Sequence, residues 1–338
     1  MALLSIVRVI TTICLSGMLS LAGTSFATDE IAVSVLVETQ KVHRLEPLYV
    51  TFVITNVSTT NVVLPIGFLG YDIQHRSSGA VITGGFRSSV WGEAPCKEII
   101  NIPARGSRIE RMLLYTIVEL GFGGARSVGD FRMQAVIELD GKYWSAWLWD
   151  TNTEKRVDVY SPCWSGKVCS AWLDMTVAPI EDAADKGVIE MLSPGEKDAA
   201  QKASVHVWSH NRGSRHLYKE ALEKYPQSLF AKYCDFYAAE RAEPWEWEDA
   251  VNHYRNVIEK YPVFQLTDDA KLRLAKIYLT PDCAYKDPAG TRAKALQLLE
   301  SIVKDHPQSD SVTEARELLK KLFAIPISTG ATNGVLRK

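Results

Sequence analysis

Two kinds of hydrophobic pattern divide the chain. Across residues 31–177, apolar and polar residues alternate in short runs such as Ile31–Val37 and Leu48–Thr55. Alternation at every second position predicts strands that bury one face. Across residues 216–323, apolar residues instead recur every three or four positions, which is typical of amphipathic helices. The pattern predicts a β-rich half followed by an α-helical half.

Further strands are predicted in the first half, each bounded by turn residues. They are expected at Val62–Ile66, Gly70–Arg76, Val81–Gly84, Arg108–Tyr115, Gly129–Leu139 and Cys169–Val177. The pair Asp140-Gly141 predicts a hairpin turn, because Asp-Gly favours tight turns. Asn56-Val57-Ser58 matches a glycosylation sequon, but an asparagine in a turn explains it more simply. Many short strands predict a two-sheet sandwich over residues 28–178.

Three segments of this half resemble bacterial immunoglobulin-like domains. Glu46–Asn56 is similar to their Glu/Pro turn and the alternating strand that ends in Thr-Asn. Ile102–Gly106 resembles their later Pro/Gly turn, and Gly129–Ala135 resembles their Gly-x-Tyr/Phe strand. The resemblance implies an immunoglobulin-like β-sandwich, although the Cys–Trp–Cys spacing of antibody domains is missing. It implies a fold and no particular activity.

An internal repeat organises the second half. The segments Ala221–Pro226, Val257–Pro262 and Ile302–Pro307 end alike, and each proline is expected to stop a helix. Ala250 and Ala295 each lie twelve residues before such a proline. We expect these small residues to let a paired helix approach closely.

Four residues after each alanine come Tyr254 and Leu299, and Ser214 with Tyr218 is a weaker third copy. This pattern resembles the second helix of tetratricopeptide repeats. The resemblance implies all-α helical repeats over residues 205–323, which form a scaffold that binds peptides or proteins and holds no catalytic residues.

The intervening segments read as partner helices. They are predicted at Phe230–Ala239, Asp269–Tyr278 and Val312–Phe323. Pro226 and Pro262 are 36 residues apart and Pro262 and Pro307 are 45 apart, against 34 in the tetratricopeptide family. The longer gap predicts an insertion at Thr280–Pro288.

The first 27 residues read as a secretory signal peptide. Arg8 precedes an apolar stretch that is short for a membrane span, and Ser25-Phe26-Ala27 fits a cleavage site before Thr28. We therefore expect a periplasmic or secreted protein without stable membrane insertion. Residues 179–204 are predicted to be a linker with a short helix, and residues 324–338 a disordered tail.

Charge bears on nucleic acid as a partner, and cysteine content bears on disulfides. The formal net charge of the 338 residues is −2. Residues 28–178 hold 14 basic and 16 acidic residues, and residues 179–338 hold 23 and 24, so neither half has the basic excess that nucleic-acid binding requires. An exported chain permits disulfides, and Cys163–Cys169 and Cys234–Cys283 are two candidate pairs. Sequence does not fix the pairing, and free buried thiols remain an alternative.

Aromatic residues supply the binding candidates. Trp144, Trp147 and Trp149 cluster in the β-rich half, where indole rings either fill the core or offer a platform to sugars. In the helical half, Tyr233 and Tyr237 are candidates for partner contact.

Motifs for chemistry are missing. The sequence holds no zinc-protease, nucleophile-elbow, phosphate-loop or dinucleotide motif, and we expect no cofactor, no metal and no catalysis. The acids of Glu243–Asp249 are explained by a helix N-terminus. Three functions stay open: an envelope scaffold for a protein or peptide, a carbohydrate- or cell-wall-binding module that uses the tryptophans, and an extracellular hydrolase or peptidase inhibitor.

Overall fold

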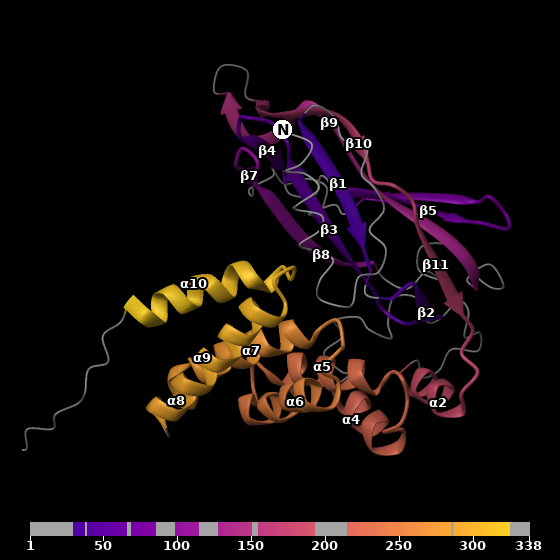
Figure 1. Cartoon of the computed structure of the whole chain (residues 1–338), viewed down its shortest axis with the longest axis vertical. Helices are drawn as coiled ribbons and strands as arrows, with labels where there is room; N and C mark the ends of the chain where they lie inside the picture. The colour runs from indigo at the N-terminus through magenta and orange to yellow at the C-terminus, as the bar shows by residue number, and fades with distance from the viewer. Residues whose placement is uncertain are drawn as a thin grey trace, which may run out of the picture. The chain divides into compact units, whose positions relative to one another are not determined.

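The computed structural model describes residues 30–37, 39–65, 69–85, 99–114, 128–150, 155–192, 215–284 and 287–324. The chain divides into two compact units, Met1–Asn211 and Arg212–Lys338. Strands make up most of the first unit, and helices make up the second (Figure 1). This confirms the predicted division into a β-rich and an α-helical half. The predicted signal peptide and tail lie outside the described residues, apart from Ala324.

The first unit builds three sheets from mostly antiparallel strands. One sheet has the order β1-β3-β8, a second has the order β2-β11-β9-β5-β6 with β10 also on β9, and the third pairs β4 with β7. Their bounds are β1 Ile31–Leu36, β2 Lys41–His43, β3 Leu48–Asn56, β4 Val62–Pro65, β5 Leu69–His75, β6 Val81–Gly85, β7 Ile99–Ile102, β8 Ser107–Leu114, β9 Gly129–Asp150, β10 Lys155–Cys169 and β11 Leu173–Ala178. A helix, α2 (Ala183–Leu192), follows within the predicted linker.

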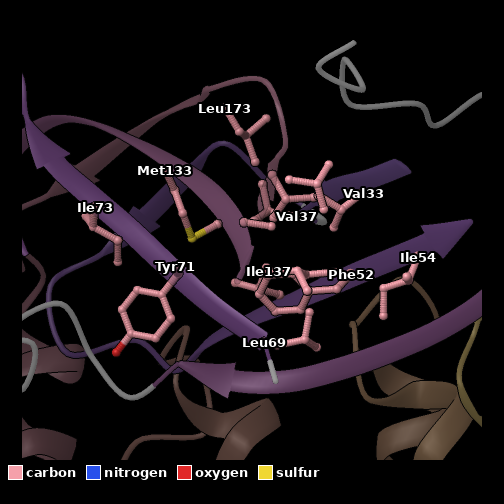
Figure 2. Close-up of a cluster of buried hydrophobic side chains, with 14 of the residues drawn as sticks. Val33, Val37, Phe52, Ile54, Leu69, Tyr71, Ile73, Met133, Ile137 and Leu173 are labelled. Carbon is pink, nitrogen blue, oxygen red and sulfur yellow. The ribbon is translucent and has the colours of Figure 1, made fainter. Parts of the chain in front are cut away.

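One hydrophobic core joins the three sheets. Strand β3 buries every second residue, including Phe52 and Ile54, as its alternating sequence predicts. Figure 2 shows these side chains gathered with those of Ile73, Met133 and Ile137 from the second sheet. Burial of apolar side chains from facing strands stabilises the unit by roughly 25 cal/mol for each Å² removed from water.

The Asp140-Gly141 pair does not form the predicted hairpin turn. Strand β9 runs through it without interruption and pairs with β10 on both sides. Gly141 has a φ of 89°, and the register of β10 shifts between Pro162 and Ser165 directly opposite. Glycine adopts this positive φ without strain, so at this position it accommodates an irregularity within the β9–β10 pairing and not a turn.

Asn56 organises the turn at the end of β3. Its side-chain amide donates to the carbonyls of Thr60, Ile102 and Pro103, at 2.7, 2.9 and 3.1 Å, and its oxygen accepts from Ser58. The residue is fully buried. The turn interpretation of the sequon is confirmed, because a glycan could not be attached to an enclosed amide.

The second unit is a succession of helices. They are α4 Arg215–Lys224, α5 Ala231–Ala242, α6 Trp247–Lys260, α7 Thr267–Tyr278, α8 Pro281–Ala284, α9 Pro288–Asp305 and α10 Ser311–Ala324. The main helices pack in chain order, with α4 on α5, α5 on α6, α6 on α7, α7 on α9 and α9 on α10 (Figure 1). The short helix α8 lies in the predicted insertion.

A backbone motif recurs wherever a helix ends at the repeated proline. The amides of Ser228, Phe264 and Ser309 donate to the carbonyls of Tyr225, Tyr261 and His306, at 3.1, 2.9 and 2.9 Å. These three amide-bearing residues are themselves buried. The same turn therefore follows α4, α6 and α9, so the sequence repeat is also a structural repeat. We call the assembly of α4, α5 and α6 the first junction and that of α6, α7 and α9 the second junction.

The residues that the repeat pattern predicts between paired helices lie inside the junctions, and we call these helix–helix contacts the seams. Ala250 and Tyr254 on α6 and Ala295 and Leu299 on α9 are all 0% exposed. Tyr218, at the corresponding position of α4, is also fully buried. The small and large residues at fixed distances from Pro262 and Pro307 are thus buried, as their spacing predicts.

Candidate functional site

The two tyrosines predicted to contact a partner are core residues. Tyr233 packs edge-on against Phe264, and its hydroxyl accepts from Gln265 at 3.1 Å. Tyr237 stacks on Tyr218, and both Tyr233 and Tyr237 are at most 3% exposed. On α5 these residues face the helices on either side, so their rings lie in the interior of the helical unit.

The tryptophan candidates lie on the hairpin of β9 and β10. The backbones of Trp144, Trp147 and Trp149 pair with Tyr160, Asp158 and Arg156. Their side chains lie outside the described residues, so the predicted sugar platform stays a prediction.

The four candidate cysteines, Cys163, Cys169, Cys234 and Cys283, do not form disulfides. Cys163 and Cys169 both belong to strand β10, six residues apart, which corresponds to roughly 20 Å at the usual rise of a strand. A disulfide requires Cα atoms within about 7 Å, so the candidate pair Cys163–Cys169 is wrong. Cys234 on α5 and Cys283 on α8 are both buried, and burial together with the nearby Asp235 raises the pKa of the Cys234 thiol.

The first junction holds a groove of about 520 Å³. Helix α4 lines it with Lys219, Leu222 and Glu223, and helix α6 lines it with Asp249, His253 and Asn256. Helix α5 packs against both and contributes Asp235, which is only 2% exposed, at the base. The groove is therefore built by one complete repeat junction.

A buried carboxylate–imidazole pair forms the base of this groove. His253 Nδ1 donates to Asp235 Oδ1 at 2.9 Å, and the Asn256 amide donates to the same oxygen at 3.3 Å. A carboxylate in an apolar helix face would cost several kcal/mol without such donors. Because an ionised carboxylate only accepts, Nδ1 of His253 carries a proton, and Nε2 is a hydrogen-bond acceptor whenever the imidazole is neutral.

Charged and aromatic groups surround that pair. Asp249 lies 3.9 Å from His253 Nε2 and forms an ion pair with Lys219 at 2.7 Å. Tyr261 follows α6, and burial, with the charge of Asp235 as a second cause, raises its pKa to about 12. The groove thus combines an acidic base with an apolar and aromatic wall.

A second polar network fixes the helices behind the groove. The Arg273 guanidinium of α7 donates to Glu240 and to Glu243, both at 2.9 Å. The Tyr254 hydroxyl also donates to Glu243 at 2.9 Å, and burial raises the pKa of Tyr254 well above its usual range. This network joins α5, α6 and α7, so its role is to hold the junctions together.

The repeat itself marks His253 as unusual. The positions nine residues before the three prolines hold Leu217, His253 and Leu298. A leucine is therefore compatible with the fold at this position, and the histidine is a departure from the repeat. Departures from a local rule concentrate at functional or strained sites.

Sequence reasoning missed both Asp235 and His253. The available signals were a carboxylate within the apolar run Tyr233–Ala239 and a histidine in a position that otherwise holds leucine. Neither signal reveals that the two side chains meet, because they come from different helices. Chemically the pair can accept and donate hydrogen bonds. Among the described residues, no group of three or more His, Cys, Asp and Glu side chains is arranged to hold a metal ion.

In the described part of the chain, no helix is long and apolar enough to cross a membrane.

The acids Glu248 and Asp249 occupy the first turn of α6, as the helix-dipole interpretation predicts.

No protein-family model matches the chain, and no curated protein matches it either. Among solved structures, the chain is similar to the C-terminal domain of wzt, at 9% identity and a TM-score of 0.28, over 47% of this chain and 80% of that one. It is also similar to the structural genomics target SoR45, at 10% identity and a TM-score of 0.23, over 45% of this chain and 90% of that one. A β-glucuronidase of Bacteroides uniformis has 10% identity and a TM-score of 0.18, over 77% of this chain and 32% of that one. At these TM-scores, the likenesses assign neither a fold family nor an activity.

Proposed function

We propose that this protein is a non-catalytic, exported scaffold of the cell envelope, whose helical unit binds a protein or peptide partner in the groove of the first junction. In this proposal the β-rich unit is an immunoglobulin-like sandwich and the helical unit is a tetratricopeptide-like array. The signal-like pattern of residues 1–27 supports export.

One observation carries the binding proposal. A carboxylate–imidazole pair with a buried carboxylate, Asp235 with His253, lies at the base of a groove large enough for a side chain and its flanking backbone. Two other repeat copies do without that histidine, so packing does not require it. A stacked helical scaffold offers such grooves to extended partners.

A selection with a defined probe tests the proposal. The full chain is immobilised and panned against a random dodecapeptide library displayed on phage. The selected peptides are then measured by fluorescence anisotropy on the wild type and on Leu222→Trp, which fills the groove. Ile258→Trp is the matched control, because Ile258 holds the same position in the second junction and is likewise half-buried.

We expect the selected peptides to bind the wild type and Ile258→Trp, and to lose at least tenfold in affinity on Leu222→Trp. Equal binding to both variants would contradict the groove. Soluble cell-wall oligosaccharides serve as a parallel probe. If they bind while no peptide does, the tryptophan-rich hairpin becomes the better candidate site.

A further inference from the structure

The geometry points to a specific partner chemistry: the groove of the first junction seats a lysine or arginine side chain of an extended peptide. This inference rests on the proposed function and adds the chemical identity of the anchoring residue.

Charge is the first argument. The ionisable groups that line the groove, with His253 neutral, are two lysines and three acids: Lys219, Lys260, Glu223, Asp235 and Asp249. One negative charge is left over, and the two carboxylates nearest His253 lie deeper than the lysine at the rim, since Lys260 is exposed. A cationic group entering this groove is therefore attracted more strongly by its base than it is repelled by its rim.

Hydrogen-bonding capacity is the second argument. His253 Nε2, the Asn256 side-chain oxygen and the carboxylates all accept hydrogen bonds, while the donors of His253 and Asn256 are turned to Asp235. The base of the groove is thus rich in acceptors. Ammonium and guanidinium groups are pure donors, so they complement it.

Shape is the third argument. Leu222 and Tyr261 line the same groove, half-buried, beside the acceptors. Lysine and arginine have long aliphatic stems that pack on apolar surface while the charged head reaches polar partners. A short polar side chain would leave this wall uncovered, and an acidic one would face Asp235 and Asp249.

The equivalent positions of the second junction provide an internal contrast. Asp235 and Asp249 correspond to Lys271 and Lys294, and His253 corresponds to Leu298. Lys271 lies 3.3 Å from His306, which takes the position of Tyr261. The acceptor-rich base is thus specific to the first junction, so a basic anchor would distinguish the two.

The ion pair between Lys219 and Asp249 gives a test that misfolding cannot imitate. A ligand cation competes with Lys219 for Asp249. Lys219→Gln therefore removes the competing cation and is expected to strengthen binding of a basic peptide by about threefold. Asp249→Asn is expected to weaken it by roughly tenfold. Arg255→Gln is the matched control in the second junction and is expected to change nothing.

The experiment uses the full chain and the dodecapeptides selected from the phage library. Supporting results are a lysine or arginine at one fixed position of the selected peptides, a loss of at least tenfold when that residue is replaced by norleucine, and opposite shifts for Lys219→Gln and Asp249→Asn. Peptides that need the groove but carry no fixed basic residue would overturn this inference and leave the proposed function standing. Unchanged or weakened binding to Lys219→Gln would also overturn it. If no peptide binds at all, the proposed function fails as well.

Discussion

The first and second junctions share their seams and differ in their grooves. Ala250 and Tyr254 in the first correspond to Ala295 and Leu299 in the second, and all four side chains are fully buried. In contrast, the groove positions change in charge, from Asp235 to Lys271 at the base. The shared residues are those that a stacked pair of helices needs for packing.

The differing residues face water or one another, and the fold does not dictate them. Asp235 requires two donors to be stable in its position, whereas Lys271 extends to His306 beside the next turn. The comparison teaches that stability and recognition use separate positions of the same repeat. Substitutions at the two sets of positions should therefore have separable effects.

The largest effect is expected at the seams. Tyr254→Ala and Leu299→Ala each create a cavity in a fully buried contact, and each is expected to lower the free energy of unfolding of the helical unit by about 3 kcal/mol. Urea denaturation followed by far-ultraviolet circular dichroism measures this loss. The exposed Lys304→Ala on α9 is the control. Losses below about 1 kcal/mol at either seam would show that the two seams are not equivalent cores.

The next largest effect on stability is expected in the groove, at His253 and Asp235. His253→Leu gives the first junction the residue of the other two copies but leaves Asp235 without its main donor, so we expect a loss of about 2 kcal/mol. Adding Asp235→Leu removes the stranded carboxylate and should return stability to within about 1 kcal/mol of the wild type. A double-mutant cycle by urea denaturation measures the coupling. Simple additivity of the two losses would contradict the pairing.

A smaller effect is expected at Cys234. The equivalent positions in the other copies hold Ala270 and Ala315, so Cys234→Ala is expected to cost about 1 kcal/mol or less. In the wild type, burial raises the pKa of this thiol, and Cys234 should resist alkylation under native conditions. Mass spectrometry after brief iodoacetamide treatment measures the alkylated fraction of Cys234 in native and in unfolded samples. Rapid alkylation of Cys234 in the native chain would mean that α5 is not enclosed.

The smallest effect concerns alkaline pH. The pKa of Tyr261 is about 12 in the folded chain against 10.0 for an ordinary tyrosine, so the unfolded chain loses this proton first. The associated stability is complete below pH 10 and is lost between about pH 10 and 12. Because the ring is half-exposed, we expect a change below about 1 kcal/mol. Tyr261→Phe should flatten this part of the pH profile relative to Tyr225→Phe, and an unchanged slope would refute the assignment.

Much of the fold could be predicted from local patterns. The alternation in Leu48–Thr55 and the fixed spacing of Ala250 and Ala295 from their prolines each express a physical requirement that nearby residues reveal. The hairpin turn predicted at Asp140-Gly141 was wrong, because a glycine with positive φ also occurs at an irregular position within a strand. Tyr233 and Tyr237 misled because an aromatic residue on a repeat helix suits a seam as well as a binding face.

The candidate site was harder to predict than the fold. Asp235 and His253 meet only after α5 and α6 pack, and their sequence separation does not fix the angle between those helices. The leucine at the other two copies of the His253 position was a visible signal, but it identifies an exception and not its partner. Internal repeats therefore locate functional residues by contrast, while geometry assigns their chemistry.

The most direct test reads the protonation of His253 itself. Long-range ¹H–¹⁵N imidazole spectra of the full chain, with His253→Gln to assign the resonance, report which ring nitrogen carries the proton. We expect the proton on Nδ1, held by Asp235, and a marked shift of the Nε2 resonance when a selected basic peptide saturates the chain. A proton on Nε2, or an Nε2 resonance that the bound peptide leaves unchanged, would contradict a binding groove at the first junction.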